Sequence, residues 1–173
     1  MKLTNYFIKK KIQTLASGVS ARPHECCPLA DAKHILVLFQ ASDREVIEPC
    51  LDKLRKQQKK VSACVYVTGE TVPEMDASYL VVRANKDLDA WFCPKDTVVE
   101  NCKALKADIL IDLTRSGCYP MQYLLLQHPC RFKVGIKQED ADLYDLAISV
   151  TERDNIRQLF EHILFYLQSI RSK

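Results

Sequence analysis

Hydrophobic residues follow two different patterns along this chain. Short, nearly uninterrupted runs lie in 34–39, 61–68 and 107–113, whereas other segments repeat a hydrophobic residue every three to four positions. The uninterrupted runs predict strands that are covered on both faces, and the 3.6-residue period predicts helices. Because strands and helices alternate, the pattern predicts an α/β fold with a single doubly wound, mostly parallel sheet in a three-layer sandwich.

Weaker patterns complete the predicted order of elements. Further strands are expected at 79–82, 131–136 and 144–150, and helices at 3–15, 46–54, 97–105, 120–125 and 156–170. The segment 16–33 has no periodicity and contains one glycine and two prolines, so it predicts an irregular linker. We therefore divide the chain into an N-terminal basic helix with its linker, residues 1–33, and a Rossmann-like α/β domain, residues 34–173.

Cap residues refine the predicted helices. Ser42 and Glu45 have the spacing of a capping box, and Thr151 and Asp154 are expected to cap the last helix. Pro49 falls inside a helical stretch, where a proline kinks the helix or costs on the order of 3 kcal/mol.

One loop is expected to be ordered. Residues 86–94 contain the only tryptophan of the chain, Trp91, next to Phe92. Large aromatic residues in such loops are more often buried anchors than platforms for a ligand. We therefore expect both rings to clamp this loop onto the domain.

The predicted central strand, 107–113, delivers polar side chains to its carboxyl end. Open α/β sheets bind ligands outside the carboxyl ends of their strands, where the strand order reverses. A reversal between the first and fourth strands brings the loops after residues 39 and 112 together. The candidate ligand-binding residues are Gln40, Ser42, Asp43, Asp112, Thr114, Arg115 and Ser116. Hydroxyls, helix N-termini and the Arg115 guanidinium suit a phosphate or a carboxylate.

A purely structural interpretation of Asp112 stays open beside this one. The carboxylate could cap the following helix or tie its own loop together. The loop after residue 39 has no glycine, so it contains neither a dinucleotide fingerprint nor a phosphate-cradling P-loop. Dinucleotide binding of the usual kind is therefore not expected.

Motifs for metal binding and nucleophilic catalysis are faint. The segment His24-Glu25-Cys26-Cys27 has adjacent cysteines, which cannot easily point at one ion, and no second ligand pair of zinc spacing follows. The chain has no phosphatase loop with an arginine six positions after a cysteine, and no Gly-x-Ser-x-Gly elbow. A pair of His128 with Cys118 or Cys130 is a minor alternative. We expect no metal and no cofactor.

The net charge of +3 is unevenly distributed. Residues 1–22 hold Lys2, Lys9, Lys10, Lys11 and Arg22 and no acid, which leaves 20 of the 25 bases against all 22 acids, a net charge of −2, in the rest. A slightly acidic body argues against a domain that reads nucleic acid. The basic helix could pack on the domain, or it could contact an anionic membrane surface or a protein partner.

Length and composition predict one domain with one core. No hydrophobic run is long enough to span a bilayer, and a secretory hydrophobic region is missing near the N-terminus, so we expect a cytoplasmic protein. In that compartment the eight cysteines should be reduced.

Three stretches carry a resemblance to known families. They are Lys86-Asp87-Leu88-x-x-Trp91-Phe92-x-Pro94-Lys95, Ala107-Asp108-Ile109-Leu110-Ile111-Asp112-Leu113 and Cys130-Arg131-Phe132-Lys133-Val134-Gly135. Together they resemble a small uncharacterised bacterial family of stand-alone Rossmann-like proteins, over most of the chain up to Val150. The second and third stretches are also similar to the N-terminal half of heptosyltransferase-type glycosyltransferases. Those transferases bind the sugar nucleotide largely through a second Rossmann domain, which this chain is too short to contain.

Two functions follow from these observations. The leading hypothesis is a non-catalytic or accessory domain that binds a protein partner or a small anionic ligand, with peripheral contact to an anionic membrane through residues 1–22. The alternative is an enzyme that acts on a nucleotide or sugar phosphate in the Asp112 crevice, as a glycosyltransferase-like half-site completed by dimerisation.

Overall fold

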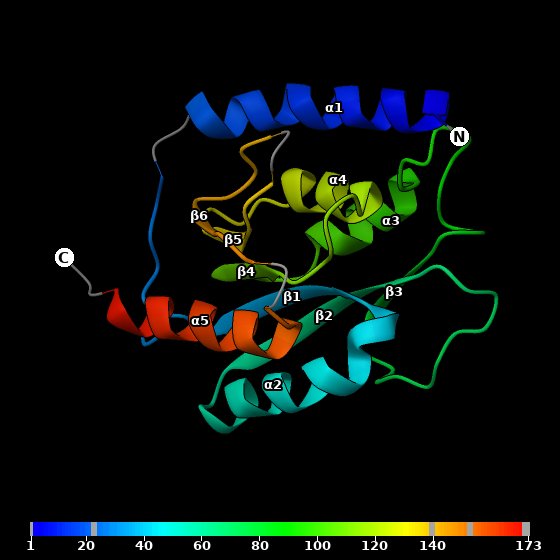
Figure 1. Ribbon diagram of the computed structural model, residues 1–173. Helices are drawn as coiled ribbons and strands as arrows, with labels where there is room; N and C mark the ends of the chain where they lie inside the picture. The colour runs from blue at the N-terminus through cyan, green and yellow to red at the C-terminus, as the bar shows by residue number, and fades with distance from the viewer. Residues whose placement is uncertain (1, 22–23, 139–140, 152–153, 171–173) are drawn as a thin grey trace.

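The computed structural model describes residues 2–21, 24–138, 141–151 and 154–170 (Figure 1). Within these residues six strands form one sheet, in which every neighbouring pair is parallel. The strands are β1 (His34–Gln40), β2 (Lys60–Val67), β3 (Leu80–Arg83), β4 (Ile109–Asp112), β5 (Lys133–Ile136) and β6 (Leu146–Ile148). Their order is β3-β2-β1-β4-β5-β6, so the direction of winding reverses between β1 and β4. This arrangement confirms the predicted doubly wound α/β fold.

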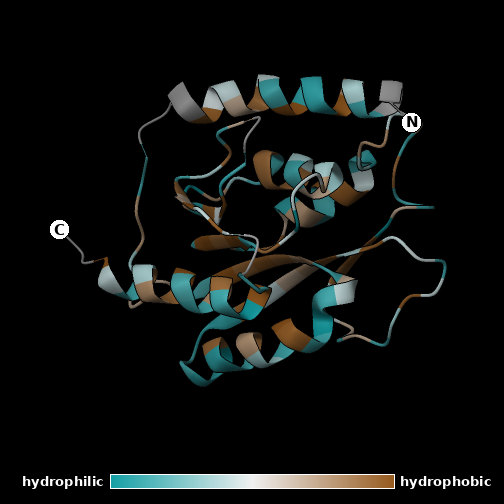
Figure 2. Ribbon diagram, in the orientation of Figure 1, coloured by the Kyte–Doolittle hydropathy of each residue, from teal (hydrophilic) through white to brown (hydrophobic). Residues whose placement is uncertain are grey.

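Helices cover both faces of the sheet (Figure 1). They are α1 (Lys2–Ala21), α2 (Arg44–Lys56), α3 (Asp96–Lys103), α4 (Tyr119–Gln127) and α5 (Ile156–Ser169), and a short 3-10 helix (Ala41–Asp43) precedes α2. Helices α2 and α5 lie on one face, and α3, α4 and α1 lie on the other. Figure 2 shows that the hydrophobic residues concentrate in the strands between these layers.

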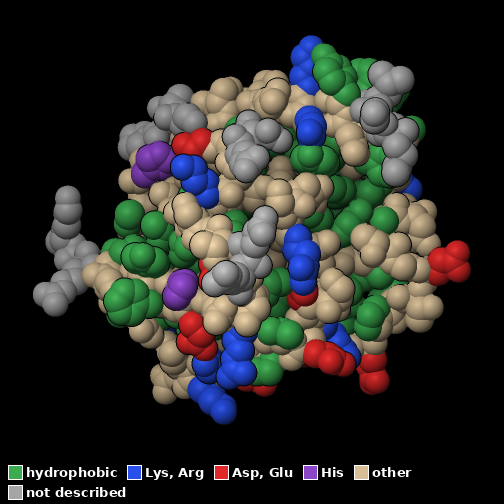
Figure 3. Space-filling model, viewed as in Figure 1, with side chains coloured by type: hydrophobic (Ala, Val, Ile, Leu, Met, Phe, Trp, Pro, Cys, Tyr) green, Lys and Arg blue, Asp and Glu red, His purple; other side chains and the backbone are tan. Residues whose placement is uncertain are grey.

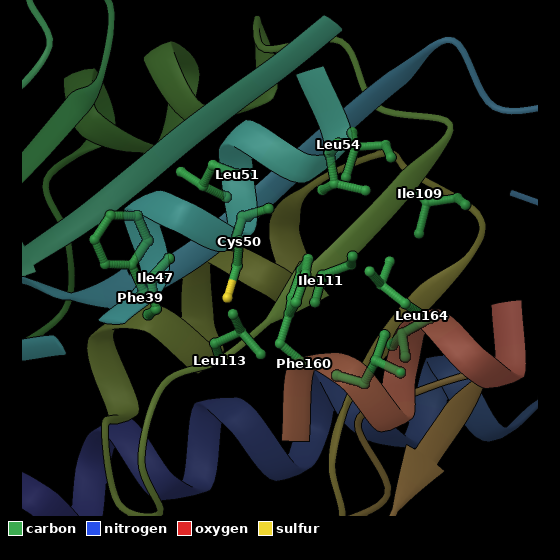
Figure 4. Close-up of a cluster of buried hydrophobic side chains, with 14 of the residues drawn as sticks. Phe39, Ile47, Cys50, Leu51, Leu54, Ile109, Ile111, Leu113, Phe160 and Leu164 are labelled. Atoms are coloured by element: carbon green, nitrogen blue, oxygen red, sulfur yellow. The ribbon is translucent and has the colours of Figure 1, made fainter. Parts of the chain in front are cut away.

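The strands separate two hydrophobic cores because consecutive side chains point to opposite faces. Val37 and Ile111 contribute to the core beneath α2 and α5, whereas Leu38 and Leu110 contribute to the core beneath α1, α3 and α4. Figure 4 shows how the first core is filled from α2, α5 and the strands. Phe160 of α5 is fully buried there, and burial of such a side chain contributes roughly 2–3 kcal/mol relative to exposure.

Helix α1 packs on the domain and is longer than predicted. Its buried residues Ile8, Ile12, Ala16 and Val19 recur at helical spacing, and the helix continues through Gly18, which we assigned to the linker. Glycine weakens a helix by about 1 kcal/mol relative to alanine, but burial of the residues on either side offsets that cost. The first three of these buried side chains belong to the second core. The structure therefore shows that the inner side of α1 packs on the domain, and contact of its outer side with a membrane or a protein partner stays a prediction.

Both predicted capping arrangements are wrong in detail. Helix α2 begins at Arg44 after a 3-10 turn, in which the Arg44 N–H donates to the Ala41 carbonyl, and Ser42 is exposed. The backbone of that turn takes over the role that we gave to the Ser42 side chain.

At α5 the capping box consists of Asn155 and Gln158. Each side chain accepts the other residue's backbone N–H, at 2.9 and 3.2 Å. Asp154 accepts instead from the backbone and hydroxyl of Thr151, which closes the turn before the helix. The predicted cap was therefore one residue too early.

The loop 86–94 is ordered for a different reason than predicted. Trp91 and Phe92 are 48% and 40% exposed, so they are not buried anchors. The loop is closed instead by Asp89, whose Oδ1 accepts from the Trp91 and Cys93 backbone N–H groups at 2.8 and 3.0 Å. A carboxylate that bonds the backbone two residues ahead replaces hydrophobic anchoring.

Candidate functional site

The reversal between β1 and β4 brings the two predicted loops into contact. The Arg115 backbone N–H donates to Gln40 Oε1 at 2.9 Å. The Arg115 guanidinium also reaches Asp43, with Nη2 2.6 Å from Oδ1 and Nε 3.3 Å from Oδ2. Gln40, Asp43 and Arg115 therefore form one cluster, as the topology led us to expect.

Asp112 does not join this cluster. Strand β4 alternates, so Ile111 and Leu113 face α2 and α5, while Asp112 faces the second core. The sheet consequently separates Asp112 and its loop partner Thr114 from the Asp43–Arg115 pair. Ser42 is exposed, and Ser116 borders a hollow beside α1 and α4. Whether these seven residues bind a ligand stays a prediction.

A cleft of about 670 Å³ lies between the N-terminal ends of α2 and α5. It is lined by Asp43, Glu45, Val46, Pro49, Arg115, Asp154, Asn155, Ile156 and Arg157. Its volume is within the range of small-molecule sites, roughly 300–1,000 Å³. The N-terminal ends of both helices contribute residues to the cleft, and their dipoles favour negative charge there.

Arg115 is held in place at this cleft by Asp43. Its side chain is 65% exposed, whereas the Asp43 side chain is only 8% exposed. The hydrogen bonds and charge of Asp43 raise the pKa of Arg115, which is therefore permanently charged. The carboxylate engages Nε and Nη2, and among the described residues Nη1 has no hydrogen-bond partner. The guanidinium is held along one edge and presents its other end to solvent.

Acidic groups in the cleft are partly neutralised. Asp43 is paired with Arg115, and Asp154 accepts the two hydrogen bonds from Thr151, which lower the pKa of this carboxyl. Arg157 adds a second cation from α5. The polar chemistry of the cleft therefore suits a small anion that takes hydrogen bonds from a guanidinium.

Asp112 lies at the centre of a closed polar network. Its side chain is 1% exposed, and Oδ1 accepts from the Thr114 backbone N–H at 2.9 Å and from the Thr114 hydroxyl at 2.6 Å. Oδ2 accepts from the Tyr144 hydroxyl at 2.7 Å. Burial raises the pKa of the Asp112 carboxyl, although all three donors oppose that shift. Asp112 thus ties its own loop and does not cap α4, whose N-cap residue is Cys118 and has no side-chain cap bond.

Tyr144 and Gly135 are the residues of this network that the sequence did not reveal. Burial and the charge of Asp112 hold the pKa of Tyr144 well above its ordinary value, so the hydroxyl stays a donor. A Cβ at Gly135 would lie 2.4–2.9 Å from three atoms of the Tyr144 ring. Gly135 is therefore required for close approach of the ring to β5. In the sequence, the glycine after Val134 in a predicted strand was the one sign of a close approach, and it did not indicate that Tyr144 is the residue that approaches.

The cysteines and His128 do not form a nucleophilic pair. His128 Nε2 donates to the Leu105 carbonyl, 2.7 Å away, and Nδ1 accepts from the Cys130 backbone N–H at 3.0 Å. Burial lowers the pKa of His128, which favours this neutral form. Burial and the nearby Asp112 raise the pKa of Cys118 to about 12, so its thiol is protonated at neutral pH.

Contacts within the protein hold the segment around Cys26 and Cys27. His24 Nδ1 bonds the buried Asp145 at 2.8 Å, and the Cys27 thiol donates to the Pro28 carbonyl. In the parts of the chain that the structure describes, no group of three or more His, Cys, Asp or Glu side chains could hold a metal ion. Nor do the described helices include one with the length and hydropathy to cross a membrane.

Comparison with known proteins supplies the family and no activity. No curated protein and no solved structure matches the chain. One family profile matches residues 4–170, which is nearly the whole chain, and includes β4, the Arg115 cleft and the Asp112 network. The chain belongs to this family, a family of unknown function (DUF6913).

Proposed function

We propose that this protein is a non-catalytic binding protein that takes a small anionic ligand in the cleft between α2 and α5. The observation that carries the proposal is the position of Arg115. Its guanidinium lines the cleft at the reversal point of the sheet, Asp43 bonds Nε and Nη2, and Nη1 has no hydrogen-bond partner among the described residues. A pre-positioned guanidinium loses little conformational freedom when it binds a phosphate or carboxylate.

The surroundings of Arg115 support the same ligand class. Arg157 and the N-terminal end of α5 border the cleft, so an anion bound there would have a second guanidinium and a helix N-terminus available in addition to Arg115. The cleft has room for a ligand of the size of a nucleotide or a sugar phosphate. Glu45 and Asp154 on the rim disfavour ligands with several charges and favour a single phosphate or carboxylate.

The contacts of Asp112 favour binding over catalysis. The alternative function is an enzyme that acts on a nucleotide or sugar phosphate in the Asp112 crevice, in line with the resemblance to heptosyltransferase-type glycosyltransferases. Such a role requires an accessible carboxylate. Asp112 is 1% exposed and already accepts three hydrogen bonds on the face of the sheet opposite the cleft. A cytoplasmic location and reduced cysteines stay predictions.

Calorimetric titration with inorganic phosphate, adenosine monophosphate and glucose 1-phosphate tests the proposal. We expect at least one probe to bind, and Arg115→Gln to weaken its affinity by about 1.5–3 kcal/mol, because a charge-assisted hydrogen bond is lost. Arg157→Gln should weaken the affinity for the same probe by a smaller factor. This second variant keeps the Asp43–Arg115 pair, so it still tests the proposal if the unpaired Asp43 carboxylate destabilises Arg115→Gln.

Arg131→Gln is the matched control. Arg131 is 74% exposed and pairs with Glu25 beside the amino end of β5, at the other edge of the sheet. Its replacement should leave the affinity unchanged. The proposal fails if none of the three probes binds at millimolar concentration, or if all three substitutions change the affinity equally.

A further inference from the structure

Four large aromatic side chains are exposed side by side on the α1 side of the molecule. Tyr6, Phe7, Trp91 and Phe92 are 55%, 41%, 48% and 40% exposed. The Phe7 ring centroid lies 4.6 Å from that of Trp91 and 5.7 Å from that of Tyr6. We call these four residues the aromatic patch. Exposed hydrophobic side chains that gather in one patch mark an interaction site more often than scattered ones do.

The loop that carries half of this patch is built to hold its rings outward. Asp89 bonds the backbone of Trp91 and Cys93, and the Cys93 side chain is buried beneath the loop. Phe92 has a φ of +61°, a left-handed conformation that is unfavourable for a bulky residue. Such a conformation persists only where neighbouring contacts impose it, and it occurs preferentially at functional positions.

Lysine side chains border the patch. Lys10 Nζ lies 5.9 Å from the centre of the Tyr6 ring. Lys10, Lys11 and Phe7 also line a mainly apolar groove of about 320 Å³ between α1 and α4. Figure 3 shows hydrophobic and basic side chains next to one another at the upper right, where the N-terminal half of α1 lies. Aromatic rings interleaved with lysines are typical of surfaces that contact the headgroup region of a bilayer.

We propose that the aromatic patch, together with Lys10 and Lys11, docks this protein on the surface of an anionic lipid bilayer. Charge complementarity selects this partner, because residues 1–22 carry five basic residues and no acid while the rest of the chain has a net charge of −2. Basic residues near an anionic surface add favourable energy individually, and tyrosine and tryptophan rings suit the boundary between water and lipid.

Docking leaves the fold intact. Ile8 and Ile12 on the inner side of α1 are buried in the second core, so the helix contributes its outer edge without leaving the domain. Helices α2 and α5, whose N-terminal ends border the cleft beside Arg115, lie on the other face of the sheet (Figure 1). A docked molecule would therefore keep that cleft open to solvent, and this inference stands independently of the proposed ligand.

Cosedimentation of the full chain with vesicles tests the inference. The vesicles are phosphatidylcholine with or without phosphatidylserine. We expect binding to the anionic vesicles, weaker binding at high salt, and little binding to phosphatidylcholine alone. Because Trp91 is the only tryptophan, its fluorescence reports the contact directly, and its emission should shift to shorter wavelength on the anionic vesicles.

Paired variants separate the two contributions. Lys10→Gln with Lys11→Gln should weaken binding to anionic vesicles about 30-fold, because each lysine near the surface contributes roughly 1 kcal/mol to the binding free energy. Phe7→Ala with Tyr6→Ala should weaken it about tenfold or more and still leave Trp91 as the probe. The matched control is Phe165→Ala with Tyr166→Ala, an exposed aromatic pair on α5 that should change nothing.

Three results would overturn the inference. The first is the absence of both sedimentation and a fluorescence shift with anionic vesicles. The second is equal loss of binding in the α5 control. The third is a concentration-dependent dimer that disappears with Phe7→Ala and Tyr6→Ala, because a second copy of the chain would then cover the patch. Circular dichroism of each variant establishes that it is folded.

Discussion

Two polar clusters lie within a few residues of each other at the carboxyl end of β4, and they have opposite characters. On one face of the sheet Asp112 is closed in by Thr114 and Tyr144, and every oxygen of its carboxylate accepts a hydrogen bond. On the other face Arg115 is anchored by Asp43 and remains 65% exposed beside a cleft. A buried, fully bonded acid stabilises a loop, whereas an anchored and exposed guanidinium can bind a ligand.

Residues that are close in sequence at the end of a strand need not belong to the same site. The alternation of β4 turns Asp112 toward the second core, whereas Arg115 lies in the loop beyond the strand and is drawn to the other side by Gln40 and Asp43. Both clusters depend on residues far away in sequence. Asp112 requires Tyr144, and Arg115 requires Asp43.

The largest expected effect concerns the closed cluster. In Gly135→Ala the new Cβ would lie 2.4–2.9 Å from the Tyr144 ring, which is buried and cannot move without breaking its bond to Asp112. We expect a loss of about 3 kcal/mol in the free energy of unfolding, measured by urea titration. Gly69→Ala is the control, because the nearest atom to its Cβ is 3.9 Å away, and it should change stability by less than about 0.5 kcal/mol. Equal stability of both variants would show that the Tyr144 contact is not rigid.

A smaller loss is expected when one donor is deleted from the same cluster. Tyr144→Phe removes the hydroxyl that bonds Asp112 Oδ2 and leaves that buried oxygen without its donor. We expect a cost of about 2 kcal/mol in unfolding free energy. Tyr166→Phe, at a 49% exposed position, should cost almost nothing. Phosphate affinity at the Arg115 cleft should be the same in both variants. A drop in that affinity with Tyr144→Phe would mean that the two faces are coupled.

The smallest expected effect is a change in pH dependence. Burial raises the pKa of Asp112 above its ordinary value of 3.8, so the folded protein holds this proton more tightly than the unfolded chain does. The contribution of Asp112 to the free energy of unfolding therefore falls as pH rises from below 3.8 to above the raised pKa. Asp112→Asn removes the titration and keeps the shape.

The matching measurement is urea unfolding of wild type and Asp112→Asn between about pH 3 and pH 7. The stability of the variant relative to wild type should increase with pH across this window. If the stability of the variant relative to wild type decreased with pH, the three hydrogen-bond donors would outweigh burial in setting the pKa of Asp112. The ionised carboxylate would then be the form that stabilises the folded protein.

Much of the fold followed from local pattern. Uninterrupted hydrophobic runs identified β1, β2 and β4, and the repeat of Leu159, Ile163 and Leu167 identified α5, because both patterns are dictated by the geometry of one element. The meeting of Gln40, Asp43 and Arg115 was predicted on the condition that the strand order reverses between the first and fourth strands, and the structure meets that condition. Errors arose where short-range rules competed, as at Ser42, where a 3-10 turn replaced the capping box.

Contacts between distant segments could not be predicted. Gly135 and Tyr144 look ordinary in the sequence, and their close approach exists only once β5 and the segment before β6 lie together. Trp91 and Phe92 were predicted as buried anchors on the basis of residue type. The structure exposes them because Asp89 already closes the loop and Phe7 offers a ring on the surface.

The sequence by itself determined the alternation of strands and helices, the edge of the sheet that gathers polar loops, and the concentration of positive charge in α1. These properties depend on the local periodicity of side chains and on composition. Only the tertiary structure decided that Asp112 and Arg115 face opposite layers, that α1 is packed with its aromatic edge outward, and that Tyr144 completes the buried network. The reason is physical: burial and hydrogen-bond partnership are set by the register and packing of the assembled layers, which no single segment encodes.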